Sequence, residues 1–156
     1  MSALPATAFV DVPLLLQAGD DRDPARRDRA RDWLRKCWSE RRGRLSVQVL
    51  NEYYREVSRQ FATPIAAGDA RAEVRRYQHW KPWQVDHATV ETAWAIESRY
   101  GLPYWDALVV ASAQQQGCAC VLSDRLPHGM QIDSVQVLDP FLTPPERLDQ
   151  PWPGPV

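Results

Sequence analysis

The sequence predicts an α/β fold in which a small parallel sheet of about four to five strands is wrapped by helices. Short apolar runs rich in β-branched residues at positions 6–10, 118–123 and 134–138 are typical of buried strands. Helical patterns separate the first of these strands from the last two, which favours parallel pairing through right-handed crossovers. The chain has 156 residues, 44% hydrophobic and 25% charged, and therefore fits one globular domain.

Capping residues, prolines and glycines mark where the helices begin and end. An Asp or Ser before a proline or an apolar run marks a start, because its side-chain oxygen caps free backbone N–H groups. A glycine after the last turn marks an end. Helices are therefore expected at residues 14–18, 23–40, 47–62, 65–80, 86–100 and 104–116, with a short further strand at 44–46. The segment 107–111 is apolar on every side, which predicts that the last helix is central.

The C-terminal segment differs from the rest of the chain. Prolines recur from residue 140 to residue 155, and this composition disfavours regular structure. We therefore expect residues 1–141 to form the domain and residues 142–156 to form a tail on the surface.

Bulk charge and hydropathy exclude some functions. The net charge of −1 gives no overall attraction to nucleic acid or membrane, although ten basic residues lie between positions 20 and 44. That block is either a phosphate-binding face or a solvated helix with local ion pairs. No apolar run is long enough for a signal peptide or a membrane span, so we expect a cytoplasmic protein.

Four acidic residues are expected to meet at one edge of the sheet. Asp11 and Asp124 each follow a strand-like run, and ligands of open α/β sheets collect at the carboxyl ends of strands. Glu52 and Asp106 lie at or near helical faces that are predicted to be buried, and Trp105 is expected to enclose Asp106. Four carboxylates at one edge would repel one another unless a cation lay between them. This predicts a divalent metal site, while helix capping remains an alternative for Asp11.

Five blocks of the sequence resemble PIN-domain ribonucleases, and most closely the VapC-like toxins of bacterial toxin–antitoxin pairs. The blocks occur in the order and spacing of that family, at residues 9–16, 45–54, 104–113, 122–129 and 139–141. The resemblance implies a three-layer, PIN-like fold and a metal-dependent endoribonuclease that cleaves RNA phosphodiesters. It also implies an antitoxin protein as partner, pairing into homodimers and no membrane contact.

The resemblance assigns roles to particular residues. The catalytic acids that it implies are Asp11, Glu52, Asp106 and Asp124. The first three would hold Mg²⁺ or Mn²⁺, which would activate water for attack on phosphorus. Ser123 and Arg125 are expected to contact the RNA substrate.

The sequence departs from the family pattern in two places. The family usually has Thr and Asn after the first Asp, whereas Val12 and Pro13 follow Asp11 here. Arg125 stands where the family has its last Asp, and is expected either to bind the scissile phosphate or to neutralise the acids and weaken metal binding. The chain is therefore either an endoribonuclease with reduced activity or a degenerate PIN domain that binds RNA or protein without cleavage.

Several aromatic residues are candidates for binding partners. Trp80, Trp83 and Tyr104 either stack on unpaired bases or pack in the core. Trp33 and Trp38, on the helix at 23–40, offer a contact surface for an antitoxin.

Overall fold

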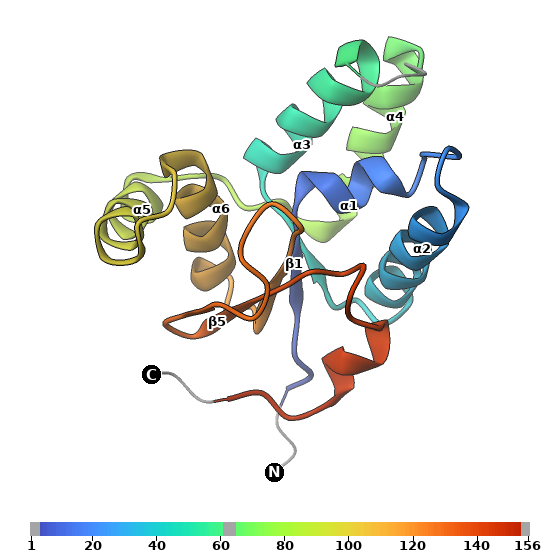
Figure 1. The fold of residues 1–156 in the computed structure, drawn as a ribbon. Coiled ribbons are helices and arrows are strands. Elements are labelled where there is room, and N and C mark those ends of the chain that lie inside the picture. Colours follow the sequence, from blue (N-terminus) through green and yellow to red (C-terminus); the bar gives the residue numbers. More distant parts are fainter. Residues whose placement is uncertain (1–3, 61–64, 154–156) are drawn as a thin grey trace.

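A five-stranded sheet in the order β2-β1-β3-β5-β4 forms the centre of the computed structural model, which describes residues 4–60 and 65–153 (Figure 1). The strands are β1 (Ala8–Val10), β2 (Gly43–Arg44), β3 (Cys120–Leu122), β4 (Gln131–Ile132) and β5 (Val135–Leu138). Parallel pairing joins β2, β1, β3 and β5, with Phe9 opposite Val121 and Val121 opposite Val137. The predicted parallel α/β sheet is confirmed. The antiparallel edge strand β4 was not predicted, because two residues carry no periodicity.

Helices cover both faces of this sheet. They are α1 (Val12–Gln17), α2 (Pro24–Ser39), α3 (Val47–Arg55), α4 (Ala67–Arg76), α5 (His87–Tyr100) and α6 (Tyr104–Gln115). Three short helical segments are η1 (Glu56–Gln60), η2 (Tyr77–Trp80) and η3 (Pro145–Asp149). The pair α5 and α6 flanks one side of β1 and α2 flanks the other, while α1, α3 and α4 stand beyond its carboxyl end (Figure 1). The resulting three layers match the predicted architecture.

The predicted helix over residues 47–62 differs from the observed one in its second half. After α3 the backbone widens into the π-helical turn η1, and the last two residues of the predicted helix lie outside the described residues. The predicted helix over residues 65–80 begins at Ala67 and tightens into the 3₁₀ turn η2. Periodicity indicates a helix but does not resolve the local winding of its turns.

The core lies between the sheet and its helical layers. Every residue of β1 and β3 is buried, and so are residues 107–113 of α6. The prediction that this last helix is central is therefore confirmed. A helix that is apolar on all sides gains free energy from burial on all sides, which explains its position.

The described part of the predicted tail packs against α2. Trp33 is fully buried, and its indole N–H donates to the backbone carbonyls of Pro140 and Thr143 at 3.1 and 2.9 Å. Leu148 in η3 is also buried. The interpretation of Trp33 as a surface for partners is wrong, since the indole anchors the end of this chain instead.

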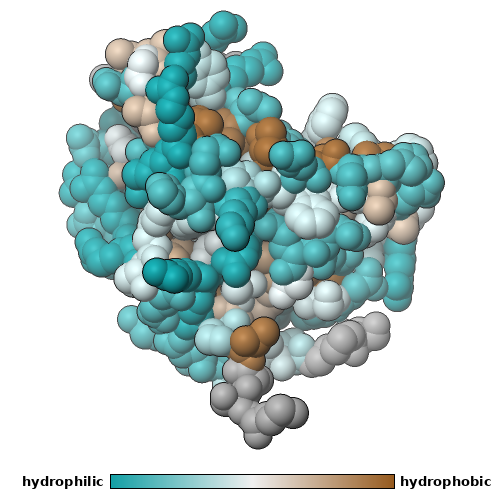
Figure 2. All heavy atoms as spheres, turned by 180° about the vertical axis from the view of Figure 1, so that it is seen from behind, coloured by the Kyte–Doolittle hydropathy of each residue, from teal (hydrophilic) through white to brown (hydrophobic). Residues whose placement is uncertain are grey.

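The surface is mostly polar. On the face turned away in Figure 1, apolar residues gather in a band across the upper half (Figure 2). No helix in the described chain is both long and apolar enough to cross a membrane.

Candidate active site

Asp11 lies at the carboxyl end of β1, and its carboxylate is held from three directions. Its Oδ1 accepts a hydrogen bond of 2.8 Å from the Val12 backbone N–H, so Asp11 also caps α1. Ser123, which follows β3, donates its hydroxyl to Oδ2 at 2.8 Å. The Arg125 guanidinium donates to both oxygens, with Nη2 at 2.9 Å from Oδ1 and Nε at 3.2 Å from Oδ2. Because only 1% of Asp11 is exposed, this carboxylate is satisfied almost entirely by the protein.

Arg125 also faces α3 across an open cleft. Its Nη2 lies 3.5 Å from Oε2 of Glu52. One helical turn earlier, the Gln48 side-chain amide donates to Glu52 Oε1 and to the Trp105 carbonyl, each at 3.3 Å. The cleft has a volume of about 590 Å³ and is called the acidic cleft below. It is lined by Gln48, Asn51, Glu52, Arg55, Glu56, Trp105 and Arg125.

The charge of Arg125 also affects the pKa of two further carboxylates, those of Asp106 and Glu56. Burial raises the pKa of Asp106, in the first turn of α6; Arg125 opposes the rise and Asp11 adds to it. Burial also raises the pKa of Glu56, again against Arg125 and with contributions from Glu52 and Asp11. Burial by itself lowers the pKa of Arg125, but Asp11, Glu52 and Asp106 outweigh it, so the guanidinium pKa lies above its ordinary value. Four carboxylates therefore surround one positive charge, which is partly exposed.

Asp124, the fourth predicted catalytic acid, is directed elsewhere. Its carboxylate forms an ion pair of 2.9 Å with Arg26 of α2, whose guanidinium also lies 3.8 Å from the centre of the Phe141 ring. The backbone bends at residues 124–126, directly after β3, and the Arg125 N–H donates to Ser123 Oγ at 3.1 Å within this bend. Ser123 and Arg125 reach Asp11 while Asp124 reaches α2.

The residues as arranged do not fit Mg²⁺ or Mn²⁺. These ions need several oxygen ligands with free lone pairs, and the Asp11 carboxylate already accepts hydrogen bonds on both oxygens. Within residues 4–60 and 65–153, no three Asp, Glu, His or Cys side chains form a group that could hold a metal ion. The predicted ligands Asp11, Glu52 and Asp106 are gathered around the guanidinium of Arg125 instead.

Sequence reasoning missed several residues of the cleft. Glu56 follows Glu52 by four residues, and this helical spacing was a signal that could have placed it in the same site. Trp105 was expected to enclose the neighbouring acid, but 64% of this residue is exposed at the rim of the cleft. No sequence signal distinguishes an exposed tryptophan from a buried one at the start of an apolar helix.

Of the three aromatic residues predicted either to stack on bases or to pack in the core, Trp80 packs in the core. A Cβ atom on Gly43 would overlap the Trp80 indole, so the ring can pack here only because residue 43 has no side chain. The indole N–H of Trp83 donates to Thr89 Oγ1 at 2.9 Å, which directs that ring toward the start of α5. Tyr104 is half-buried beside the cleft.

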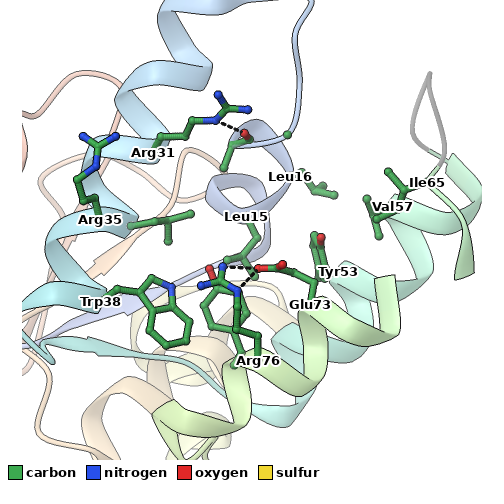
Figure 3. A pocket seen from close by; sticks show the side chains of 14 residues that line it. Leu15, Leu16, Arg31, Arg35, Trp38, Tyr53, Val57, Ile65, Glu73 and Arg76 are labelled. Atoms are coloured by element: carbon green, nitrogen blue, oxygen red, sulfur yellow. Dashed lines mark hydrogen bonds and ion pairs between the residues drawn. The ribbon is translucent and has the colours of Figure 1, made fainter. Parts of the chain in front are cut away.

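A second hollow of about 410 Å³, the helical groove, lies between α2 and the helices α1, α3 and α4 (Figure 3). Its floor is apolar and its rim carries three arginines. Arg31 donates to the Ala18 carbonyl at 2.8 Å, and Arg76 is paired with Glu73 (Figure 3). The apolar lining is Leu15, Leu16, Ala18, Gly19, Leu34, Trp38, Tyr53, Val57, Ile65 and Tyr77.

The sequence and the fold are similar to those of known proteins. The crystal structure of the toxin VapC20 from Mycobacterium tuberculosis, described as cleaving the sarcin–ricin loop, is similar in fold. The match has a TM-score of 0.57 at 22% sequence identity, and covers 74% of this chain and 87% of that one. No curated protein matches the sequence. The family model described as PIN domain matches residues 8–126, which span β1 to the segment after β3. The chain therefore belongs to the PIN domain family.

Proposed function

We propose that the protein is an attenuated endoribonuclease of the toxin type, which binds RNA at the acidic cleft and cleaves its phosphodiesters slowly. The observation that carries this proposal is the convergence of Asp11, Glu52, Glu56 and Asp106 on the guanidinium of Arg125, which lines the cleft. Membership of the PIN domain family, a family of nucleases, supports the reaction class. The likeness to an RNA-cleaving toxin supports the substrate class as an analogy of fold.

Arg125 accounts for the attenuation. A divalent ion can reach Asp11 only when the guanidinium leaves, and its binding must offset the loss of several charge-assisted hydrogen bonds. Val12 and Pro13 add to this effect, because the polar groups that the family carries beside this Asp are absent. Groups that orient metal ligands typically change affinity or activity by about 10- to 100-fold.

A second candidate function is a binding module without cleavage. It is favoured by the full occupation of the Asp11 carboxylate. While Arg125 binds Asp11, the cleft can still accommodate RNA or protein, but a divalent ion cannot reach that carboxylate. The two candidates differ in one measurable property, which is whether Asp11 becomes available to a divalent ion.

The test combines metal binding with RNA cleavage. Arg125→Asp places a carboxylate where the family has one, and Arg55→Asp makes the same charge change elsewhere in the cleft. We expect calorimetry to detect Mn²⁺ binding to R125D but not to the wild type or R55D. With Mn²⁺ present, R125D should cleave single-stranded RNA about 10- to 100-fold faster than the wild type.

Asp106→Asn is the control for the chemistry, and it should abolish cleavage by both the wild type and R125D. If the wild type shows no cleavage that Asp106→Asn abolishes, the endoribonuclease proposal is rejected and the binding module stands. If the wild type cleaves as fast as R125D, the role given to Arg125 is wrong.

We also propose that a cognate antitoxin is the protein partner, in the cytoplasm, and that it docks in the helical groove. The apolar floor suits the apolar face of a partner segment, and the arginine rim suits acidic residues on its flanks. Leu16→Glu, at a half-buried position of the groove lining, should abolish copurification with the antitoxin, whereas Arg55→Asp, in the acidic cleft, should leave it intact. Copurification of both variants would exclude the groove as the docking site.

A further inference from the structure

Trp105 is unusually exposed for a residue of its size. It lies in the first turn of α6 and is 64% exposed, whereas Trp33 and Trp80 are buried. Val47, which lines the same hollow as Trp105, is 40% exposed as well, and adjoining exposed apolar side chains often mark a binding site. The ring is nevertheless not free to move widely, because it packs edge-on against Tyr104 with 5.1 Å between ring centres.

The indole lies between two hollows. Trp105 and Gln48 both line the acidic cleft, and both also line a neighbouring hollow of about 610 Å³. The hydrogen bond from Gln48 to the Trp105 carbonyl fixes the backbone at their boundary. The second hollow is lined by apolar side chains together with the amides of two glutamines: Val47, Gln48, Gln84, Val85, Val90, Tyr104, Trp105 and Leu108. A flat group with a polar edge would match both kinds of surface.

The charges around the acidic cleft make phosphate contacts alone a weak basis for RNA binding. The cleft region contains four carboxylates against the guanidinium groups of Arg55 and Arg125, so its net charge repels phosphates. In the described chain, Nη1 of Arg125 makes no hydrogen bond, which leaves donors for one phosphate. Phosphate contacts alone would hold an RNA strand weakly here. A contact that does not depend on charge is needed, and stacking of a base on an aromatic ring supplies one.

We propose that Trp105 stacks on an unpaired nucleobase of the RNA, and that the adjoining hollow holds this base beside the phosphate on Arg125. The proposal rests on the proposed function and names the part of the substrate that gives affinity. The substrate would then be single-stranded or looped at this position, because a paired base does not expose its face.

A second copy of this chain is the rival occupant of the same apolar surface. The position of Trp105 on the boundary with the acidic cleft favours RNA, because a base stacked there leaves its own phosphate within the cleft. The amides of Gln48 and Gln84 also favour a base, since they offer donors and acceptors to its edge.

The experiment measures binding of a fluorescein-labelled, single-stranded RNA of about ten nucleotides, within the site sizes of such proteins. EDTA prevents cleavage, and fluorescence anisotropy reports the dissociation constant. Trp105→Ala removes the ring, Trp105→Phe keeps an aromatic face, and Trp94→Ala removes another exposed indole, located on α5. We expect W105A to weaken binding by about 5- to 150-fold, the range of one stacked base, and W94A to bind like the wild type. W105F should lie close to the wild type.

A scan of abasic sites along the RNA separates stacking from an indirect effect. One position should exist at which removal of the base weakens binding to the wild type and changes nothing for W105A. If the abasic sites weaken binding equally in both proteins, the ring acts through folding or through a second copy, and the inference is wrong. Equal affinity of W105A and the wild type also refutes it while leaving the proposed function intact. A wild type that binds no RNA at all refutes both.

Discussion

Two arginines of this protein each bind a carboxylate far away along the chain, and they differ in which partner is buried. Arg42 pairs with Asp149, 107 residues away, and Arg125 pairs with Asp11, 114 residues away. Arg42 is 7% exposed and its carboxylate partner lies at the surface. In the second pair the carboxylate is 1% exposed, while the arginine side chain is 36% exposed.

The remaining partners of the two arginines differ as well. Arg42 donates to the backbone carbonyls of Ala6 and Leu148 at 2.7 and 2.8 Å, and to Glu40 at 2.8 Å. These bonds tie both ends of the domain to the strand β2, and only the planar fork of a guanidinium reaches all of them. Arg125 instead donates to both oxygens of Asp11 and lies near Glu52, so its side-chain partners are carboxylates. Arg42 is thus held by backbone carbonyls as well as by carboxylates, whereas Arg125 is held by carboxylates. We therefore expect that another cation can replace Arg125 but not Arg42.

Substitution of Arg42 should have the largest effect on stability. Arg42→Gln removes the donor to the Ala6 carbonyl and one of the donors to both Leu148 and Glu40. Because Arg42 is buried, we expect a loss of about 3 kcal/mol in the free energy of unfolding. Urea denaturation would measure it, with Arg35→Gln as control, since Arg35 is exposed on α2 and its ion pair within the described residues is with the exposed Asp32. Mn²⁺ should not restore stability to R42Q. A loss no larger than that of R35Q would remove Arg42 from its structural role.

Arg125→Gln should have a smaller effect that a cation reverses. The Asp11 carboxylate keeps Ser123 and the Val12 N–H, so we expect a loss of about 1–3 kcal/mol rather than the full cost of an unpaired buried charge. A ligand that binds only the folded state raises stability by mass action. Urea titrations of R125Q should therefore shift to higher midpoints as Mn²⁺ is added.

The same titrations of the wild type should not shift, because its own arginine occupies the site. If wild type and R125Q respond equally to Mn²⁺, the two cations do not compete for one position. In that case Arg125 would not be replaceable by a metal ion, and it would not differ from Arg42 in this respect.

The sequence was enough to predict the elements that carry the site. The apolar run of β1 placed Asp11 at a strand end, and the all-round apolar segment of α6 placed Asp106 in its first turn. The spacing of α3 placed Glu52 on the shoulder of a buried face. These predictions depend on periodicity and caps, which are local properties of the chain.

The direction of the side chains after β3 could not be predicted in the same way. Whether Asp124 or Arg125 turns toward Asp11 depends on one residue of register at a strand end, and either choice satisfies the local pattern. The ion pair that holds the proline-rich C-terminal segment could not be predicted either, because its partners, Arg42 and Asp149, are far apart in the sequence. Long-range ion pairs leave no periodic trace in sequence.

Ser123→Ala should destabilise the protein less than Arg125→Gln does, and its response to Mn²⁺ should lie between those of R42Q and R125Q. The buried Ser123 hydroxyl donates to Asp11 at 2.8 Å and accepts from the Arg125 backbone N–H at 3.1 Å. Its loss removes one support of the Arg125 loop, and we expect about 1 kcal/mol of destabilisation with a weak Mn²⁺ response. Ser46→Ala, which removes a buried cap of α3, is a matched control for the loss of a hydroxyl and should show no Mn²⁺ response. A response of both variants would mean that general loosening, rather than release of Arg125, admits the ion.

The two regions should also respond to pH with opposite signs. Hydrogen bonds from Arg42 and then Lys36 lower the pKa of Asp149, so its contribution to stability is present above the ordinary value of 3.8 and is lost as pH falls through the lowered value. Burial raises the pKa of Asp106, so its contribution is present below 3.8 and is lost as pH rises through the raised value.

Neutral amides at these two positions test the sign directly. Asp149→Asn should destabilise the protein at neutral pH, and the difference from the wild type should close in acid. Asp106→Asn should instead stabilise it at neutral pH by about 0.5 kcal/mol, the scale of changes at partly exposed positions, and this gain should also vanish in acid. Urea denaturation between pH 3 and pH 7 measures both, across the window in which carboxylates titrate. A loss of stability in D106N at neutral pH would show that Arg125 already compensates this carboxylate fully, and that the cleft carries no excess negative charge for a metal ion to neutralise.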